Sequence, residues 1–369
     1  MLHHYRKGLI VEMHIPDGYL GPQTYVPACA AMVPIWWRAS EKLKKTLRMR
    51  QIPMLALGSA FSFIIMMFNV PVPGGTSGHA VGAVLVAILL GPWAAVVAVS
   101  MAVVVQALLF GDGGVTAIGA NCINMAVLMP FVGWSVYRLI ARGAASNSRR
   151  QWIGGAVGGY VGLNAAALGT AVMLGIQPII AHDTAGHALY CPFGLKTALI
   201  ALCGSHLLVL GFVEAVVTGY VIEYLQVVEP SLLPGETVRS FARTGLKPAA
   251  RVAALVGAMI LLCPLGLYIP AKFASGSAWG EWSGSEIHRI AGYVPAGFEK
   301  LDGVWRAPMP DYAPIGKTSS SMPTMSVYYI LSGVVGAGLL VTATYGLRGV
   351  LWRRSGDIDP GVDAPSDNA

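Results

Sequence analysis

Charged residues are scarce in this sequence. Asp, Glu, Lys and Arg make up 12% of the 369 residues and hydrophobic residues make up 55%, whereas a soluble globular domain has roughly 25% charged residues. A soluble chain of this length would need more charge to cover its surface, so lipid faces most of this protein. The net charge of +7 does not indicate nucleic-acid binding, because the basic residues cluster beside hydrophobic segments, as orientation signals do.

Three further features are missing. The five cysteines form no C-x-x-C pair, and their odd number argues against a disulfide framework. Residues 1–12 lack the apolar core of a cleavable signal peptide. Gly316-Lys317-Thr318 resembles the end of a phosphate loop, but Asp311 stands where the first glycine of that motif is required. We therefore expect no ATP site in this chain.

Long hydrophobic segments predict an all-α polytopic membrane protein with about nine transmembrane spans. A spanning helix needs roughly 20 mostly apolar residues. The third segment is short and breaks at Gly91-Pro92, which predicts a half-helix or a tilted hairpin surrounded by protein. The predicted spans lie near residues 22–38, 53–70, 79–91, 93–110, 119–140, 152–176, 197–225, 250–270 and 326–347.

The basic residues predict the orientation in the membrane. Alternate loops of a nine-span chain hold 17 of the 25 Lys and Arg residues, and basic loops face the cytoplasm. These loops are residues 38–50, 138–150, 239–251 and 348–354. The amino terminus is then extracytoplasmic, and the other loops on that side are residues 71–79, 111–118, 177–196 and 271–325.

One glycine pattern concerns packing. Gly154, Gly158 and Gly162, followed by Ala166, recur at every fourth residue and therefore share one helix face. Such a stripe lets a neighbouring helix approach closely. A neighbour within the same chain is the favoured interpretation, and a partner subunit is the alternative.

Histidine and loop-forming residues gather at the predicted outer end. Met13-His14 precedes the first span, and a segment rich in Gly and Pro leads to His79 at the start of the third. Such a segment allows irregular backbone to enter a cavity lined by protein. A histidine at the start of an apolar span is more often a structural hydrogen-bonding group than a ligand, but polar groups at membrane depth are candidates for function.

Several motifs resemble the CbiM/NikM family, the substrate-binding subunits of energy-coupling-factor (ECF) cobalt and nickel transporters. The last of them extends the resemblance through the seventh span. The motifs are M-H-I-P-D-G at 13–18, V-P-V-P-G-G-T-S-G-H at 70–79, L-G-P-W at 90–93, Q-A-L-L-F-G-D-G-G at 106–114, G-A-N-C-I-N-M at 119–125 and H-L-L-V-L-G-F-V-E-A-V-V-T-G at 206–219.

The carboxy-terminal part looks like the small partner subunit, NikN or CbiN, fused to the same chain. The sequence W-R-A-P-M-P-D-Y-A-P at 305–314 lies there between two spans. The resemblance therefore predicts a division of the chain into a doubtful extension, a metal-binding membrane domain, a cytoplasmic linker, a two-span part and a disordered cytoplasmic tail. These are residues 1–12, 13–228, 229–249, 250–350 and 351–369.

The resemblance implies a set of nitrogen donors for the metal. Carried onto this sequence, they are the amine of Met13, the amide nitrogen and imidazole of His14, and the imidazole of His79. Amine and amide close a five-membered chelate ring, and the amide with the nearer imidazole nitrogen closes a six-membered one. Four nitrogens in a square plane favour Ni(II) or Cu(II). The amide must lose its proton, so we expect affinity to fall as pH drops.

The printed sequence departs from that pattern because an internal Met13 has no free amine. Translation starts at Met13, or residues 1–12 are removed, or the site is different. The first interpretation is favoured, because it removes Arg6 and Lys7 from a segment that would have to cross the membrane. Met1-Leu2-His3 could chelate a metal by itself, but any exposed terminus with histidine in third place can do so.

Two asparagines and two aspartates near the outer end are candidate supporting residues. Asn121 and Asn124 could orient His79 or line its cavity, and interhelical hydrogen bonding is the equal alternative. Asp17 and Asp112 could cap loops or attract cations, and capping is favoured.

Other histidines offer weaker sites. His182 and His187 could form a second metal site in an outer loop, but their spacing differs from H-E-x-x-H, and a structured polar loop is favoured. His206 and Glu214 are two helical turns apart, so they share a face and could pair inside the bundle.

Three hypotheses for function remain at this point. The resemblance implies the metal-binding component of an ATP-driven importer, with two ATPase subunits and a transmembrane coupling (T) subunit as partners in the inner membrane. It implies Ni²⁺ or Co²⁺ as cargo, and we expect no resident cofactor. A self-contained ion-coupled transporter lacks support, because no acidic relay is visible inside the spans. An intramembrane metalloenzyme built on His182 and His187 lacks a nucleophile or catalytic carboxylate at usable spacing.

Overall fold

The structure is a computed structural model that describes residues 14–46, 51–72, 76–234, 248–273, 282–317 and 320–352. Met13 and the extension 1–12 lie outside the described residues. So do most of the predicted linker 229–249 and nearly all of the predicted tail 351–369.

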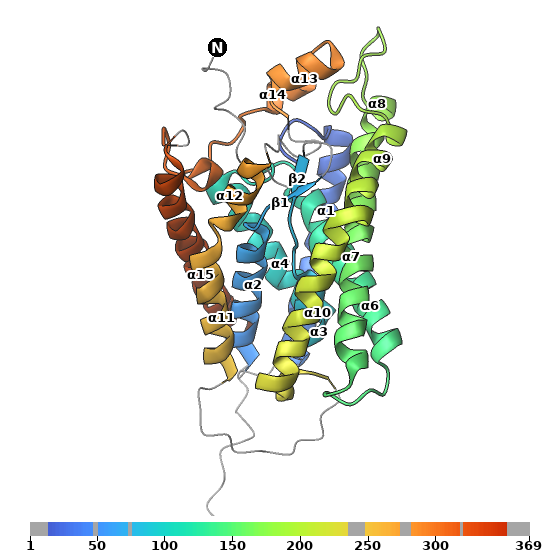
Figure 1. Cartoon of the computed structure of the whole chain (residues 1–369). Coiled ribbons are helices and arrows are strands. Elements are labelled where there is room, and N and C mark those ends of the chain that lie inside the picture. The colour runs from blue at the N-terminus through green and yellow to red at the C-terminus, as the bar shows by residue number, and fades with distance from the viewer. Residues whose placement is uncertain are drawn as a thin grey trace, which may run out of the picture.

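The described chain is a bundle of helices with one small β hairpin (Figure 1). The amino-terminal half consists of α1 Pro22–Thr46, α2 Ile52–Met66, β1 Val70–Val72, β2 Thr76–Gly78, α3 Ala83–Leu90, α4 Pro92–Val105, η2 Gln106–Phe110, α5 Ile118–Asn121, η3 Cys122–Leu128 and α6 Met129–Ala141. It is followed by α7 Arg149–Gly175, α8 Gln177–Ile180, α9 Leu195–Ser205, η4 His206–Leu210, α10 Gly211–Val228 and η5 Pro230–Leu232. The carboxy-terminal part consists of α11 Pro248–Leu262, α12 Leu265–Lys272, α13 Gly284–Ala291, α14 Ala296–Leu301, η6 Pro310–Tyr312 and α15 Met322–Trp352.

The number of helices able to cross a membrane is lower than the nine predicted spans. Within the described ranges, five helices are long and apolar enough, or six if α11 and α12, which meet at a 40° bend, form one span. Helices α2 and α3 have 15 and 8 residues. Most of their side chains are buried in the bundle. Because protein surrounds these helices, they are apolar on every side. The segment predicted as a half-helix is therefore α3, and it ends at Gly91.

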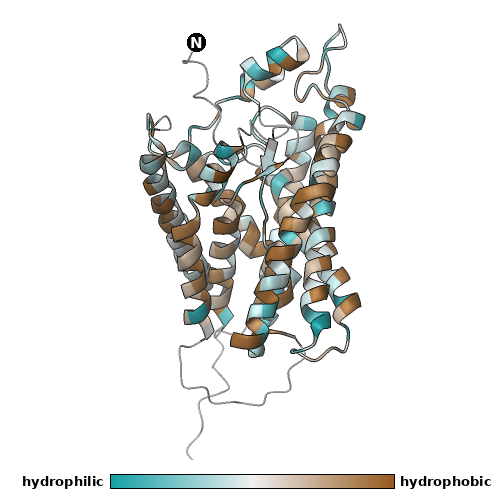
Figure 2. Ribbon diagram, in the orientation of Figure 1, coloured by the Kyte–Doolittle hydropathy of each residue, from teal (hydrophilic) through white to brown (hydrophobic). Residues whose placement is uncertain are grey.

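The two ends of the bundle carry different elements. The start of α1, the β hairpin and helices α8, α13 and α14 lie at one end (Figure 1). The turn between α6 and α7 and the start of α11 lie at the other (Figure 1). Hydrophobic residues cover much of the helices between these ends, whereas α13 carries hydrophilic ones (Figure 2). We call the end with the hairpin the outer end and the opposite one the inner end.

The glycine stripe of α7 packs against helices of the same chain, as favoured from the sequence. A Cβ atom on Gly158 would lie 2.6 Å from the carbonyl oxygen of Gly133 in α6, and one on Gly162 would lie 2.8 Å from the carbonyl oxygen of Met129. On another face of α7, a Cβ atom on Gly155 would lie 2.2 Å from Ile222 of α10. The small residues therefore bring α6 and α10 against α7.

Among the described helices, three contain a π-helical turn, which the sequence did not reveal. These turns are η2, η3 and η4, within the helices that begin at α4, α5 and α9. A π turn widens the helix by one residue and leaves main-chain groups available to other partners. In η2, the carbonyl of Leu108 accepts a hydrogen bond from Trp305 Nε1 (2.9 Å), and that of Leu109 accepts one from the amide of Met309 (2.9 Å). The carboxy-terminal part is thereby attached to the outer end of the bundle.

Candidate metal centre

The structure brings together the two histidines singled out from the sequence. His14 and His79 are buried, with 2% and 0% of their surface exposed, and their ring centroids are 5.4 Å apart with planes inclined by 34°. They lie 65 residues apart in the chain, so tertiary folding creates the pair. Met13 lies outside the described residues, so its role as a metal ligand stays a prediction.

The segment that follows His14 is held in place by its main chain. Asn121 binds both polar groups of Ile15: its Oδ1 accepts from the amide (2.9 Å), and its Nδ2 donates to the carbonyl (3.1 Å). Gly113 has φ +85°, and a Cβ atom there would lie 2.8 Å from the Cβ of His14. Only glycine fits such a conformation at such a distance. Asn121 therefore positions the backbone beside His14, and no described contact joins it to His79.

Asp17 acts as a loop cap, as favoured from the sequence. Its two carboxylate oxygens accept hydrogen bonds from the amides of Val115 (3.0 Å) and Thr116 (2.8 Å), and the Thr116 hydroxyl also donates to it. This carboxylate is therefore committed to fixing the loop between η2 and α5.

Asp112 has a different role from the favoured capping role. One of its carboxylate oxygens contacts Nδ1 of His14, and the other accepts from the Tyr312 hydroxyl and from Gln106 Nε2 (3.0 Å). Burial alone would raise the pKa of Asp112, but the charge and hydrogen bond of His14, with smaller effects of His79 and Tyr312, lower it below its ordinary value. The carboxylate therefore connects the His14 ring to Tyr312 and Gln106.

His79 is held by the chain around it. Its Nδ1 is 3.0 Å from the carbonyl oxygen of Ala80, a contact that requires a proton on Nδ1 and leaves the lone pair on Nε2. Just after it, Oε2 of Glu214 accepts from the amides of Val81 (2.8 Å) and Gly82 (3.1 Å). Glu214 also accepts from Thr218. It therefore anchors the segment that carries His79.

The predicted pairing of His206 with Glu214 is absent from the described contacts. Glu214 is occupied by the amides at the start of α3, which lack partners within that helix. His206 Nδ1 instead lies 2.7 Å from the carbonyl oxygen of Leu202. Both side chains are buried, but each has found a different tertiary or main-chain partner.

The outer segment of the carboxy-terminal part covers the amino-terminal residues. Tyr19 donates from its hydroxyl to the carbonyl of Trp282 (2.7 Å) and packs edge-on against Phe298, with ring centroids 5.3 Å apart. Gly18 has φ +86°, and a Cβ atom there would lie 2.8 Å from the Phe298 ring. Described residues of the loop predicted at 271–325 therefore pack over the segment that follows His14.

Tyr312 connects that outer segment to the histidines. Its ring stacks on Phe110 at 4.8 Å between centroids and lies edge-on to Tyr329 at 5.1 Å, while its hydroxyl reaches Asp112. Tyr312 has φ +58°, which is uncommon for a residue other than glycine. Its place in the quoted motif at 305–314 was the only signal in the sequence for this role.

Asn124 forms an interhelical contact. Its Nδ2 donates to Thr170 Oγ1 (3.0 Å) and lies 3.5 Å from Met173 Sδ, both on α7. A Cβ atom on Gly169 would lie 2.4 Å from its Oδ1. Of the two alternatives for this residue, the described contacts favour helix packing over orientation of His79.

His182 and His187 lie in an exposed polar loop. Asp183 Oδ1 accepts from the amides of Ala185 (2.9 Å) and His187 (2.8 Å), and the His187 ring lies beside Tyr293 at 5.0 Å between centroids. The described residues contain no group of three or more His, Cys, Asp or Glu side chains placed to hold a metal ion. The loop has the structured polar character that was favoured, and a second metal site there gains no support.

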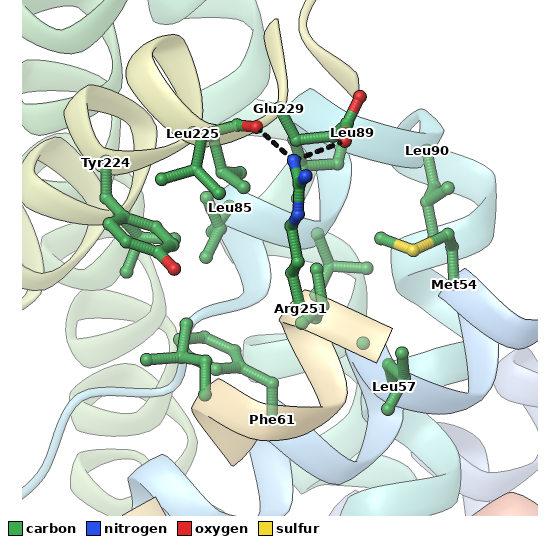
Figure 3. Close-up of a pocket in the computed structure, with 16 residues that line it drawn as sticks. Met54, Leu57, Phe61, Leu85, Leu89, Leu90, Tyr224, Leu225, Glu229 and Arg251 are labelled. Atoms are coloured by element: carbon green, nitrogen blue, oxygen red, sulfur yellow. Dashed lines mark hydrogen bonds and ion pairs between the residues drawn. The ribbon is translucent and has the colours of Figure 1, made fainter. Parts of the chain in front are cut away.

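A separate cleft opens at the inner end, and no histidine is among the residues that line it (Figure 3). It lies between α2, α3, α10 and α11 and is lined mainly by apolar side chains, among them Phe61, Leu85 and Leu225. At its edge Arg251 Nη1 binds Glu229 Oε2 at 3.1 Å. This pair ties the start of α11 to the end of α10.

Fold and site together define a polytopic α-helical membrane protein with a buried pair of histidines at its outer end. A scan of family models matches residues 14–232 to CbiM, the cobalt uptake substrate-specific transmembrane region. The chain belongs to this family.

Similar proteins extend the match beyond that region. The fused nickel transport protein NikMN of Rhodobacter capsulatus is 44% identical over 362 residues, covering 93% of this chain and all of that protein. The probable fused nickel transport protein LarMN of Lactiplantibacillus plantarum is 41% identical, covering 91% of this chain and 98% of its own. A crystal structure of a truncated transition metal transporter is 52% identical, with a TM-score of 0.54, over 58% of this chain and 98% of that one.

These matches make the chain a CbiM/NikM-type region fused to a NikN-like carboxy-terminal part. It is a multi-pass membrane protein for metal transport and not an enzyme.

Proposed function

We propose that this chain is the metal-binding membrane component of an ATP-driven nickel or cobalt importer of the ECF type. The observation that carries this proposal is the burial of His14 against His79 at the outer end of the bundle. Two enclosed imidazoles provide nitrogen ligands for a transition metal entering from outside.

The proposed ligands are the Met13 amine, the amide nitrogen and Nδ1 of His14, and Nε2 of His79. In the described structure Nδ1 of His14 contacts Asp112. A metal that binds Nδ1 therefore has to break that contact and displace any proton on Nδ1. Asp112 then serves as the group that holds the ring before the cargo arrives. This ligand set requires a free amine on Met13, which an intact mass of the purified native chain tests directly.

The choice of metal follows from geometry. A square plane of four nitrogens favours Ni(II), and the NikMN and LarMN relatives are named as nickel transport proteins. Cobalt is the alternative, since the cobalt transport protein CbiM of Acetohalobium arabaticum is 35% identical over 153 residues. Competition between the two metals for the purified chain distinguishes them.

Loss of the partner ATPases is expected to abolish metal uptake. The sequence contains no complete phosphate-loop motif, so ATP hydrolysis is expected on separate subunits, and the buried carboxylate of Glu214 is committed to the backbone at the start of α3. The measurement is accumulation of radioactive nickel in cells that express this chain with and without the ATPase and T subunits. Uptake that persists without the ATPases would favour the ion-coupled alternative.

Asp112→Asn is expected to weaken nickel affinity by about 10-fold, because the carboxylate orients the His14 ring before the metal binds and its negative charge stays close to the bound cation. The amide keeps the size of the carboxylate but removes the charge that holds Nδ1 of His14. Equilibrium titration of the purified variant measures the effect. Asp183→Asn, in the exposed loop, is the matched control, and an equal loss in both variants would contradict the role given to Asp112.

A further inference from the structure

His206 is a buried histidine that the proposed site does not use. It begins the π turn η4 inside the long helix from α9 to α10, and only 2% of its surface is exposed. Its Nδ1 lies 2.7 Å from the carbonyl oxygen of Leu202, so Nδ1 carries the proton and the lone pair is on Nε2. Nε2 is buried and has no hydrogen-bond partner among the described residues.

His206 lies next to the hairpin that leads to His79. The strand β1 of that hairpin packs against η4, the turn that begins at His206. Glu214, two turns further along the same helix, binds the amides that follow His79. One helix therefore presents two buried polar side chains to the segment that carries His79.

The hairpin presents more polar atoms on the face that carries His79. Ser77 pairs with Pro71, and Gly78 pairs with Val70. One step further in this register, Asn69 is opposite His79. Alternate residues of a strand, and residues opposite each other in a pair, share a face. Asn69 and Ser77 therefore lie on the same face of the hairpin as His79.

Buried polar atoms on this face lack partners. Oδ1 of Asn69 and Oγ of Ser77 are buried without a hydrogen-bond partner in the described part of the chain, as is Nε2 of His206. Each buried polar atom without a partner lowers the stability of the fold by roughly 1–3 kcal/mol. Several of them near one histidine therefore indicate a site for a polar group or an ion. All three can accept a hydrogen bond or bind a cation.

We propose that Nε2 of His206 is a second, transient ligand for the transported divalent metal, which it receives from His79 beside Asn69 and Ser77. The inference rests on the proposed function of the chain and adds a second metal-binding site deeper in the bundle. One imidazole with amide and hydroxyl oxygens binds a transition metal more weakly than four nitrogens do. Weak binding suits a site that the metal must leave, because transport requires that each site release its ion.

Two substitutions separate a ligand from a structural residue. In His206→Asn the amide nitrogen takes the place of Nδ1, so the bond to Leu202 is kept and the ligand atom is lost. In His206→Gln the amide reaches the place of Nε2, so an oxygen ligand is kept and the bond to Leu202 is lost. The measurement is nickel uptake by cells that contain the full chain and its partner subunits, normalised to folded protein in the membrane.

A ligand role predicts lower uptake in His206→Asn, by at least about 10-fold, than in His206→Gln. Nickel affinity of the purified His206→Asn chain is expected to stay within about twofold of the original, because His14 and His79 are retained. The exposed His288→Asn is the matched control and should change neither quantity. Uptake in His206→Asn equal to or above that in His206→Gln would overturn the proposal, as would loss of equilibrium binding in His206→Asn. Failure of the proposed function itself would appear separately, as nickel binding that survives His14→Ala.

Discussion

His14→Ala or His79→Ala is expected to lower nickel affinity by more than about 100-fold, beyond the loss that follows when a mere supporting group of a metal site is removed. Each substitution takes away one imidazole of a buried pair. In the proposed ligand set, His14→Ala removes one chelate ring and His79→Ala removes the fourth nitrogen. The measurement is equilibrium titration of the purified chain with Ni(II) and Co(II).

His182→Ala is the control for this prediction. His182 is an exposed histidine of the loop after α8, so its loss should leave most of the affinity. Unchanged binding in both His14→Ala and His79→Ala would refute the proposed centre. An equal loss in all three variants would point to a general effect on the fold.

Gly158→Leu is expected to destabilise the bundle by more than about 3 kcal/mol, at the upper end of the cost of overpacking. Even a Cβ atom at this position would lie 2.6 Å from the carbonyl oxygen of Gly133. Backbone cannot move aside as a flexible side chain can, so α6 and α7 would have to separate. The measurement is thermal unfolding of the chain in detergent, together with the yield of monodisperse protein.

Gly338→Leu in α15 is the matched control for Gly158→Leu. A Cβ atom on Gly338 meets nothing within 4 Å, and the residue is exposed on a long apolar helix. The same substitution there should be close to neutral. Equal stability of the two variants would show that the contact between α6 and α7 is not close in the folded protein.

Composition did not predict the number of membrane-spanning helices. The segments that form α2 and α3 are as apolar as lipid-facing helices, yet most of their side chains are buried within the bundle. Hydrophobicity indicates that a segment avoids water, and it does not distinguish lipid from protein as the surroundings. The short third segment and its break at Gly91-Pro92 predicted a half-helix or a tilted hairpin, and the structure has the eight-residue helix α3 there.

The network around the histidines could be predicted only in part. Asp17 was expected to cap a loop and does so, because a carboxylate near loop amides finds local partners. Asp112 was assigned the same favoured role, yet its partners include Tyr312, which is 200 residues away in sequence. Contacts across such separations have no periodicity or spacing in the sequence.

The sequence by itself determined the class of the protein and identified the two histidines as the candidate ligands, and its prediction of their side of the membrane stays a prediction. Composition, basic loops and ordered motifs express these properties directly, because each depends on residues close together in the chain. Only the tertiary structure decided that His14 faces His79, that Asp112 holds His14, and that His206 stands apart from Glu214. These depend on how helices pack, and packing is determined by shape across the whole bundle.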